Sequence, residues 1–302
     1  MKAIETTGWT EYELIDTGNF EKLERFGDVT VARPEPQAVW NKSLSQAEWD
    51  RLANAYFVRN KEGKQSQSMG DSERGEWRIK PRTKEQWYIQ YKSQQLNLSF
   101  RLGLTSFKHV GLFPEQANNW EFIFKSVQQI KEHQPTPKVL NLFAYTGGAS
   151  LAAKAAGADT THVDSVKQVV SWAKENMEAS HQDNIRWIVD DALKFAQREV
   201  RRGNTYNGII LDPPAYGRGP QGEKWILEEN INEIVSLCKQ LLQPQHSFLV
   251  LNLYSMGLSA LVGESLVKSI FGELQNIEVG ESFITDSFNK KLPLGVFIRF
   301  QL

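Results

Sequence analysis

The sequence has few of the features that mark a secreted, membrane or metal-binding protein. Cys238 is the single cysteine among 302 residues, so an internal disulfide is excluded. No apolar run approaches the roughly 20 residues of a membrane-spanning helix, and residues 1–5 lack the apolar core of a signal peptide. We therefore expect a cytoplasmic protein that has no membrane partner and no bound metal.

The net charge of the chain is also small. The chain has 35 Lys and Arg against 36 Asp and Glu, a formal net charge of −1, which argues against a surface coated throughout by nucleic acid. A local basic groove is still compatible with this balance. Arg78, Lys80, Arg82 and Lys84 recur at every second position near aromatic residues, so on a strand they would share one face. A nucleic-acid-binding face and a charge-protected edge strand both explain that spacing.

Cys238 lies in a segment with the apolar spacing of a helix. Within residues 228–242 the apolar positions are separated by three and four residues, which places them on one helical face. The pattern predicts that Cys238 is a core residue and not a nucleophile.

A strand, a glycine turn and a helix start follow one another in residues 138–150. The run Lys-Val-Leu-Asn-Leu-Phe-Ala-Tyr-Thr-Gly-Gly-Ala-Ser predicts a buried strand that enters a nucleotide-binding loop at Gly147 and Gly148. A second strand, residues 160–163, ends at Asp164. This is the distance at which an acidic residue accepts hydrogen bonds from ribose hydroxyls in related folds.

The glycine pattern argues against a dinucleotide. That fingerprint needs three spaced glycines, whereas Gly147 and Gly148 are adjacent and Ala149 follows. The loop, Asp164, the run Asp190-Asp191-Ala192 and the run Asp212-Pro213-Pro214-Ala215-Tyr216 occur in an order that resembles the class I S-adenosylmethionine-dependent methyltransferases. Residues 107–116, Phe-Lys-His-Val-Gly-Leu-Phe-Pro-Glu-Gln, resemble the segment before the cofactor loop in the branch that contains the large-subunit ribosomal RNA methyltransferases.

The expected fold is α/β, with a Rossmann-like seven-stranded methyltransferase sheet and a small, mainly β N-terminal domain. We expect residues 1–95 to form the small domain, a candidate for substrate binding, with a polar, mobile hairpin tip or loop at 61–75, and residues 96–302 to form the methyltransferase domain. Strands are expected at 139–144, 160–163, 185–189, 208–211 and 247–253, and a closing hairpin at 277–284 and 295–301.

The resemblance implies that S-adenosylmethionine binds at the carboxyl ends of these strands. The acid Asp164 would contact the ribose and Asp191 the adenine, although one of Asp190 and Asp191 is also expected to cap the following helix. The cofactor-binding residues implied by the resemblance are Phe113, Gln116, Asn141, Phe143, Ala144, Tyr145, Thr146, Gly147, Gly148, Ala149, Asp164, Ser165, Asp190, Asp191, Ala192 and Asp212.

The catalytic candidates are Asp212, Pro213, Pro214 and Tyr216. An acid and a rigid carbonyl can accept the two N–H bonds of an exocyclic amine, while an aromatic ring stacks on the base. A proline-stiffened strand exit explains the prolines but not the acid and the ring together. Carbon-5 methylation of cytosine is not expected, because Tyr254 stands where those relatives carry their cysteine.

RNA is the expected substrate, with a base nitrogen favoured as the methyl acceptor and an oxygen not excluded. Arg218 and Lys224 follow the acidic motif in a glycine-rich segment and are candidates for contacting a substrate phosphate, on a flexible loop that acts as a lid. Methylation of a protein or a small molecule is an alternative, and a non-catalytic S-adenosylmethionine-binding module is another. The oligomeric state is not indicated.

Overall fold

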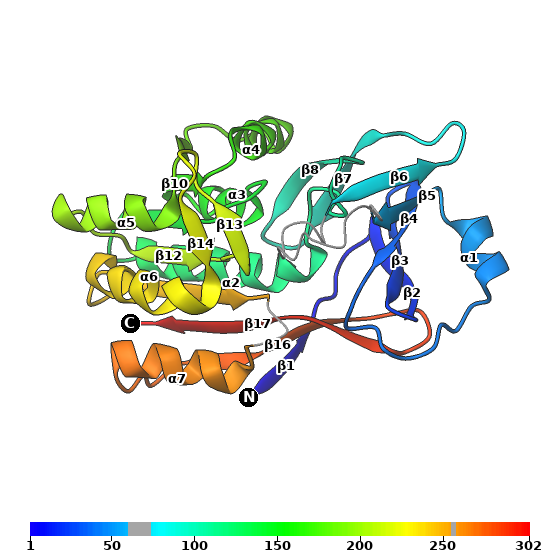
Figure 1. Ribbon diagram of the computed structural model, residues 1–302. Helices are drawn as coiled ribbons and strands as arrows, with labels where there is room; N and C mark the ends of the chain where they lie inside the picture. The colour runs from blue at the N-terminus through cyan, green and yellow to red at the C-terminus, as the bar shows by residue number, and fades with distance from the viewer. Residues whose placement is uncertain (60–73, 255–257) are drawn as a thin grey trace. The chain divides into compact units, whose positions relative to one another are not determined.

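The computed structural model describes residues 1–59, 74–254 and 258–302, which form two compact units (Figure 1). The core unit comprises Met1–Ile4, Gln116–Ser282 and Leu294–Leu302, and the β unit comprises Glu5–Glu115 and Phe283–Pro293. The boundary expected between residues 95 and 96 has no counterpart in this division. It falls between two strands that pair with each other, so both belong to the β unit.

The core unit contains an eight-stranded sheet in the order β1-β16-β17-β15-β12-β9-β10-β11. Its central strands are parallel, and β17 runs antiparallel to β15. The strands are β1 (Lys2–Glu5), β9 (Lys138–Leu142), β10 (Asp159–Asp164), β11 (Arg186–Val189), β12 (Gly208–Leu211), β15 (Phe248–Leu253), β16 (Glu278–Thr285) and β17 (Lys291–Gln301). The predicted Rossmann-like sheet and its closing hairpin are thereby confirmed.

The sheet has one strand more than the predicted seven. The additional strand is β1, four residues from the start of the chain that pair with β16 at the edge. Gly280 permits this pairing, since a Cβ there would lie 1.9 Å from the carbonyl oxygen of Lys2. So short a strand, Lys-Ala-Ile-Glu, lacks the length and apolar pattern by which a strand is predicted.

Helices cover both faces of the sheet. Helices α5, α6 and α7 lie on one side, α2 and α3 on the other, and α4 covers β10 and β11 (Figure 1). They are α2 (Ala117–Lys131), α3 (Gly148–Ala155), α4 (Lys167–Ala179), α5 (Ala192–Arg201), α6 (Leu227–Leu241) and α7 (Ala260–Phe271). A small hairpin, β13 (Tyr216–Arg218) and β14 (Lys224–Ile226), stands between β12 and α6 in the chain.

The described residues of the β unit contain a five-stranded sheet, a two-stranded sheet and one α-helix. The large sheet has the order β2-β3-β4-β5-β6, and β7 pairs with β8. The elements are β2 (Tyr12–Gly18), β3 (Glu21–Phe26), β4 (Val29–Pro34), α1 (Gln46–Leu52), β5 (Ala55–Arg59), β6 (Gly75–Ile79), β7 (Gln86–Lys92) and β8 (Asn97–Gly103). The 3-10 helix η2 (Pro114–Gln116) follows.

The alternating basic residues do not form a ladder on one strand. Strand β6 ends at Ile79, so Arg78 alone of the four lies on it, at the edge of the large sheet. Arg82 occupies a turn with a φ of 67°. The edge-strand interpretation therefore holds for Arg78, and the shared basic face is wrong because the chain turns after Lys80. The predicted loop 61–75 lies outside the described residues except for its last two positions.

Candidate functional site

The predicted site residues follow the carboxyl ends of the parallel strands in the core unit. From β9 the chain proceeds to β10 and β11 on one side, and it later places β12 and β15 on the other. The order therefore reverses between β9 and β12. In an open α/β sheet this switch point, beyond the carboxyl ends of the strands, is where ligands bind.

The loop after β9 has an unusual backbone. Phe143, Tyr145 and Gly147 have φ angles of 56°, 48° and 92°, so three alternate residues are left-handed. Two of them carry bulky side chains, which rarely adopt this conformation. The loop is held by hydrogen bonds from the Ala144 N–H to the Val163 carbonyl, at 3.1 Å, and from the Gly147 N–H to the Ala144 carbonyl, at 3.0 Å. Strain of this kind concentrates at functional sites.

The two glycines are required by internal packing. A Cβ on Gly148 would lie 2.6 Å from the ring of Trp120 in α2, and one on Gly147 would lie 3.2 Å from the Cβ of Ala173. The helix start therefore sits directly against its neighbours. The sequence indicated glycine for a positive-φ bend and for a ligand's approach, and Gly147 has the expected positive φ of 92°. The structure adds that packing against Trp120 and Ala173 restricts the two positions.

Asp164 joins the ends of β9 and β10. Its Oδ2 accepts a hydrogen bond from the Tyr145 N–H and its Oδ1 accepts one from the Val166 N–H, both at 2.9 Å. Burial raises the pKa of this carboxyl despite these contacts. Each carboxylate oxygen has two lone pairs, so Asp164 retains acceptor capacity for a ligand's hydroxyl groups.

A buried polar chain lies behind the loop. The Asn141 amide donates to Ser150 Oγ at 2.9 Å, and that oxygen lies 3.0 Å from Nδ1 of His162. Burial lowers the pKa of His162 to about 3, so the ring is neutral. The amide of Asn141, a predicted cofactor residue, is thus engaged within the protein. Ser150 and His162 were not predicted, because each follows an ordinary helix or strand pattern.

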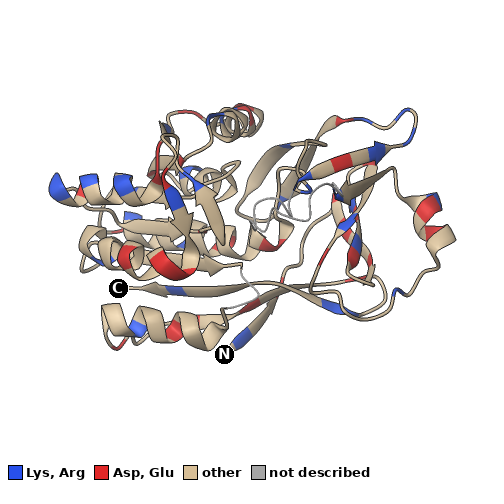
Figure 2. Cartoon of the chain, viewed as in Figure 1, with Lys and Arg blue, Asp and Glu red and all other residues tan. Residues whose placement is uncertain are grey.

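The two acids after β11 have different partners. Asp191 accepts a hydrogen bond from the Lys194 N–H at 2.9 Å and so caps α5, as expected of one of the pair. Asp190 forms an ion pair with Arg198 and accepts from the Asp191 N–H. Lys and Arg recur along α5, on which Arg198 lies (Figure 2). Asp190 therefore contacts α5 through this ion pair.

Gln116 takes part in an amide cluster. Its Oε1 accepts hydrogen bonds from the side chains of Asn119 and Asn252, each at 3.0 Å, and Asn119 in turn donates to Asn252. Asn252 is at the end of β15, so the cluster connects that strand to the start of α2. Phe113 belongs to the β unit, where its ring packs against His109.

Asp212 immediately follows β12, at the carboxyl end of that strand. Among the described residues, no group forms a hydrogen bond or an ion pair with its carboxyl. Burial alone raises its pKa to about 7. A perturbed acid at the carboxyl end of a strand, with unused acceptor atoms, is characteristic of a site that performs chemistry.

The segment after Asp212 is fixed by Trp225. The Trp225 Nε1–H donates to the Pro214 carbonyl at 2.7 Å, and the indole packs against Phe143 with 4.6 Å between ring centroids. One side chain thus connects the loop after β9 to the proline motif. The predicted flexible lid is instead the β13–β14 hairpin. Trp225 is buried between Lys224 and Ile226, but the sequence predicted neither its contacts nor strand β14.

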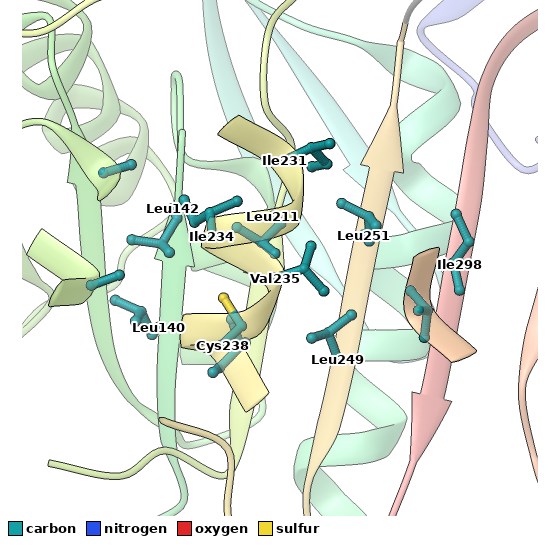
Figure 3. Close-up of a cluster of buried hydrophobic side chains, with 14 of the residues drawn as sticks. Leu140, Leu142, Leu211, Ile231, Ile234, Val235, Cys238, Leu249, Leu251 and Ile298 are labelled. Carbon is teal, nitrogen blue, oxygen red and sulfur yellow. The ribbon is translucent and has the colours of Figure 1, made fainter. Parts of the chain in front are cut away.

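Cys238 lies in the hydrophobic core, as predicted. It projects from α6 among Leu140, Ile234 and Leu249 (Figure 3). Burial raises the pKa of its thiol, which disfavours the thiolate that a nucleophile requires. Tyr254 directly follows β15. The described residues contain no cluster of metal-ligating side chains, and no described helix is long and apolar enough to cross a membrane.

Comparison with known proteins agrees with this geometry. A sequence model of the S-adenosylmethionine-dependent methyltransferases matches residues 51–279. The solved SAM-dependent methyltransferase of Agrobacterium tumefaciens is 36% identical and superposes with a TM-score of 0.87, over 100% of this chain and 93% of that chain. An inferred methyltransferase solved in complex with SAH shares the fold, with a TM-score of 0.71 at 17% identity, over 97% of this chain and 76% of that chain.

The similarity to ribosomal RNA enzymes is confined to part of their length. "Ribosomal RNA large subunit methyltransferase K/L" of Magnetococcus marinus is 30% identical over 46% of this chain and 20% of that protein. The chain thus spans about a fifth of that relative. Because the sequence model covers most of the chain, the protein belongs to the S-adenosylmethionine-dependent methyltransferase family.

Proposed function

We propose that the protein methylates RNA, at a nitrogen of a base, in the site formed around Asp212. The observation that carries the proposal is the unpartnered Asp212 carboxyl, followed by two prolines and the aromatic Tyr216. Similarity to proteins named as ribosomal RNA large-subunit methyltransferases supports RNA as the substrate.

The site fits the cofactor of the family. Asp164 would accept hydrogen bonds from the ribose hydroxyls, because each of its oxygens keeps a lone pair. The loop of residues 143–149 would hold the methionine part, and Asp191 with Ala192 would contact the adenine. When bound, S-adenosylmethionine supplies a methyl group on a positively charged sulfur.

Asp212 has two tasks in this proposal. Its carboxylate, with the Pro213 carbonyl, accepts the N–H bonds of an exocyclic amine and turns the nitrogen lone pair toward the methyl group. Tyr216 stacks on the base. The nitrogen–carbon bond forms as the carbon–sulfur bond breaks, the bonding pair goes to sulfur, and the amine proton goes to Asp212. A pKa near 7 suits that proton transfer.

Transfer of a labelled methyl group tests the proposal. The protein is incubated with labelled S-adenosylmethionine and, separately, with total RNA, protein extract and small-molecule extract from cells that lack the gene. Label is expected in RNA, on a base nitrogen by nucleoside mass spectrometry, and it should fall sharply with Asp212→Asn. Label in protein or in small molecules alone, or on a base carbon, would contradict the proposal.

A further inference from the structure

The β13–β14 hairpin presents two cations on one face. Backbone hydrogen bonds join Gly219 to Glu223, at 2.8 Å, and Leu227 to Ala215, at 3.0 Å. Hydrogen-bonded and non-hydrogen-bonded pairs alternate along an antiparallel ladder, so the Arg218–Lys224 pair between them is of the non-hydrogen-bonded kind. In such pairs the Cα atoms are about 4.5 Å apart and the side chains emerge together.

Tyr216 shares this face. Side chains two residues apart on a strand point the same way, so Tyr216 and Arg218 are neighbours about 7 Å apart along β13. The opposite face carries Trp225, which is 3% exposed and packs against Phe143. Arg218 and Lys224 are exposed. The hairpin thus turns an aromatic ring and two cations away from the core.

Neither cation is neutralised. Arg218 and Lys224 have no ion pair or hydrogen bond with any residue that the structure describes. The adjacent acid, Glu223, is engaged elsewhere, because its carboxylate pairs with Lys194 at 2.6 Å and accepts from the Gln221 N–H at 2.9 Å. Directly opposed like charges destabilise a strand pair, so an anionic partner would relieve a cost built into the hairpin.

The cations on and next to α5, unlike those of the hairpin, form ion pairs. Arg198 pairs with Asp190, Lys194 pairs with Glu223, and Arg202, directly after the helix, pairs with Glu199 at 3.0 Å. Most positive charge on that helix is therefore balanced within the protein. The positive charge of Arg218 and Lys224 on the hairpin is not balanced by any described residue, although the acidic motif at Asp212 lies only a few residues away in the chain.

We propose that Arg218 and Lys224 clamp a backbone phosphate next to the base that stacks on Tyr216, so that the substrate is recognised as single-stranded RNA. This inference rests on the proposed function and adds to it the part of the substrate that the hairpin binds. A phosphate fits two convergent cations, and an unpaired base fits the adjacent half-buried ring of Tyr216. A duplex would keep its bases stacked away from Tyr216.

The test compares the wild type with the Arg218→Gln, Lys224→Gln double variant on total RNA from cells that lack the gene. The KM for RNA should rise about tenfold, while kcat at saturating RNA and the affinity for S-adenosylmethionine stay within a few-fold. One phosphate contact fewer should make the dependence of log(kcat/KM) on log[KCl] shallower by about 0.7. Arg201→Gln with Lys174→Gln, two exposed cations on other elements, is the matched control and should change none of these values.

Competition identifies the anion. A single-stranded oligoribonucleotide should inhibit the wild type far better than a duplex of the same sequence or polyglutamate, and this preference should vanish in the double variant. Equal inhibition by polyglutamate, or an unchanged KM and salt dependence, would overturn the phosphate clamp. Absence of label in RNA with the wild type would instead overturn the proposed function itself, so the two failures are distinguishable.

Discussion

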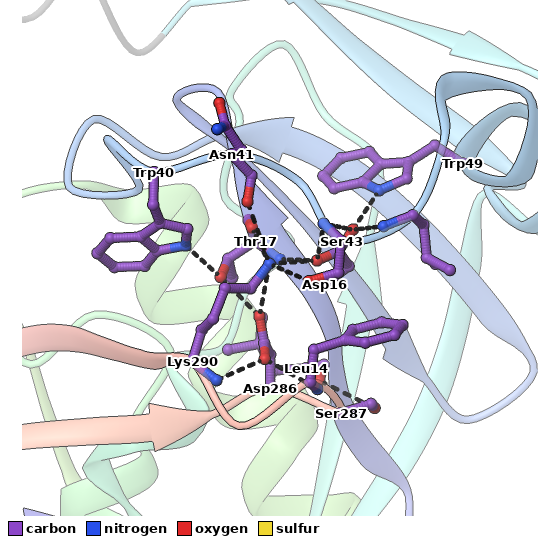
Figure 4. Close-up of polar contacts among 12 residues, drawn as sticks. Leu14, Asp16, Thr17, Trp40, Asn41, Ser43, Trp49, Asp286, Ser287 and Lys290 are labelled. Atoms are coloured by element: carbon purple, nitrogen blue, oxygen red, sulfur yellow. Dashed lines mark hydrogen bonds and ion pairs between the residues drawn. The ribbon is translucent and has the colours of Figure 1, made fainter.

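Asp16 lies on strand β2 of the β unit and Asp212 directly follows strand β12 of the core unit, but the surroundings of the two carboxyls are opposite. Asp16 is fully buried and accepts hydrogen bonds from the Leu44 N–H at 2.9 Å, from Trp49 Nε1–H at 2.8 Å and from Lys290 Nζ at 2.6 Å (Figure 4). Asp212 has no such partner among the described residues.

The pKa values follow from this difference. At Asp16 burial raises the pKa, but hydrogen bonds from Lys290, Leu44 and Trp49 outweigh burial, and the pKa lies below its usual value. At Asp212 nothing opposes burial, and the pKa rises to about 7. A carboxyl that holds a fold together is satisfied, whereas an unsatisfied one lowers stability and is retained for chemistry.

The largest effect on stability is expected at Asp16. Asp16→Asn should lower the free energy of unfolding by about 3 kcal/mol, because Lys290 loses a buried counter-charge and the hydrogen bonds lose a charged acceptor. Urea unfolding followed by tryptophan fluorescence measures the change. The control is Asp28→Asn, whose side chain is 91% exposed and which should stay within about 0.5 kcal/mol of the wild type. Equal effects of the two variants would refute a structural role for Asp16.

Asp164 lies between the two extremes, since it is hydrogen-bonded yet keeps free lone pairs. Asp164→Ala should weaken S-adenosylmethionine binding by about 1.5–3 kcal/mol, the value of hydrogen bonds to a charged acceptor. Calorimetry measures the affinity, and Asp159→Ala at the other end of β10 is the control. An unchanged affinity in the folded Asp164 variant would remove this residue from the cofactor site.

Asp212 should lower the free energy of unfolding at neutral pH, whereas Asp16 should raise it. Its pKa is raised from 3.8 to about 7, so the folded chain keeps a proton that the unfolded chain loses. Stability from this group therefore falls as pH rises from about 4 to 7. Asp212→Asn should be more stable than the wild type at pH 8, with the gap closing toward pH 4. A gap that is constant from pH 4 to pH 8 would contradict the raised pKa.

For Asp16 the linkage runs the other way. Its pKa in the folded protein is below the model-compound value of 3.8, so its contribution is present above about pH 4 and is lost as pH falls through the folded value. Below about pH 4 the stabilisation from Asp16 should therefore decrease, whereas the contribution of Asp212 to stability should no longer change.

The smallest effect is expected at Cys238. Cys238→Ala removes one buried sulfur from the core and should cost about 1 kcal/mol of stability, while methyl transfer by the folded variant stays near the wild-type rate. Thermal unfolding and a single-turnover assay measure the two quantities. Loss of transfer with normal S-adenosylmethionine binding would show that the thiol takes part in the reaction.

The sequence pattern predicted the core of this sheet because its central strands are buried on both faces. Strand β12, Gly-Ile-Ile-Leu, is completely buried and reads as an apolar run. Strand β3, Glu-Lys-Leu-Glu-Arg-Phe, was not predicted, because it carries charges that the fold buries. Although burial raises the pKa of Glu24, Arg33 and Lys22 lower it to about 2, so these groups are paired inside the protein. Such pairing within β3 and with the neighbouring strand β4 leaves no signal in the periodicity of apolar residues.

The sequence predicted those residues of the candidate site that lie in recognisable motifs. Asp164 and Asp212 stand at strand ends because parallel strands bring their carboxyl ends to one edge of the sheet. Trp225 was not predicted as a link between the loop after β9 and the proline motif, since this contact depends on the packing of a hairpin. The hydrogen bond from the Asn141 amide to Ser150 was not predicted either, since it depends on how α3 packs against β9.

The most direct test of Asp212 as the catalytic acid–base group is the pH dependence of single-turnover methyl transfer to RNA. For the wild type the rate should rise about tenfold per pH unit below pH 7 and level off above it, because the carboxylate must be ionised to accept the amine's hydrogen. Asp212→Asn should be about 100-fold slower or more and independent of pH, with its affinity for S-adenosylmethionine within a few-fold of the wild type. Equal rates and equal pH profiles for the two proteins would contradict the account.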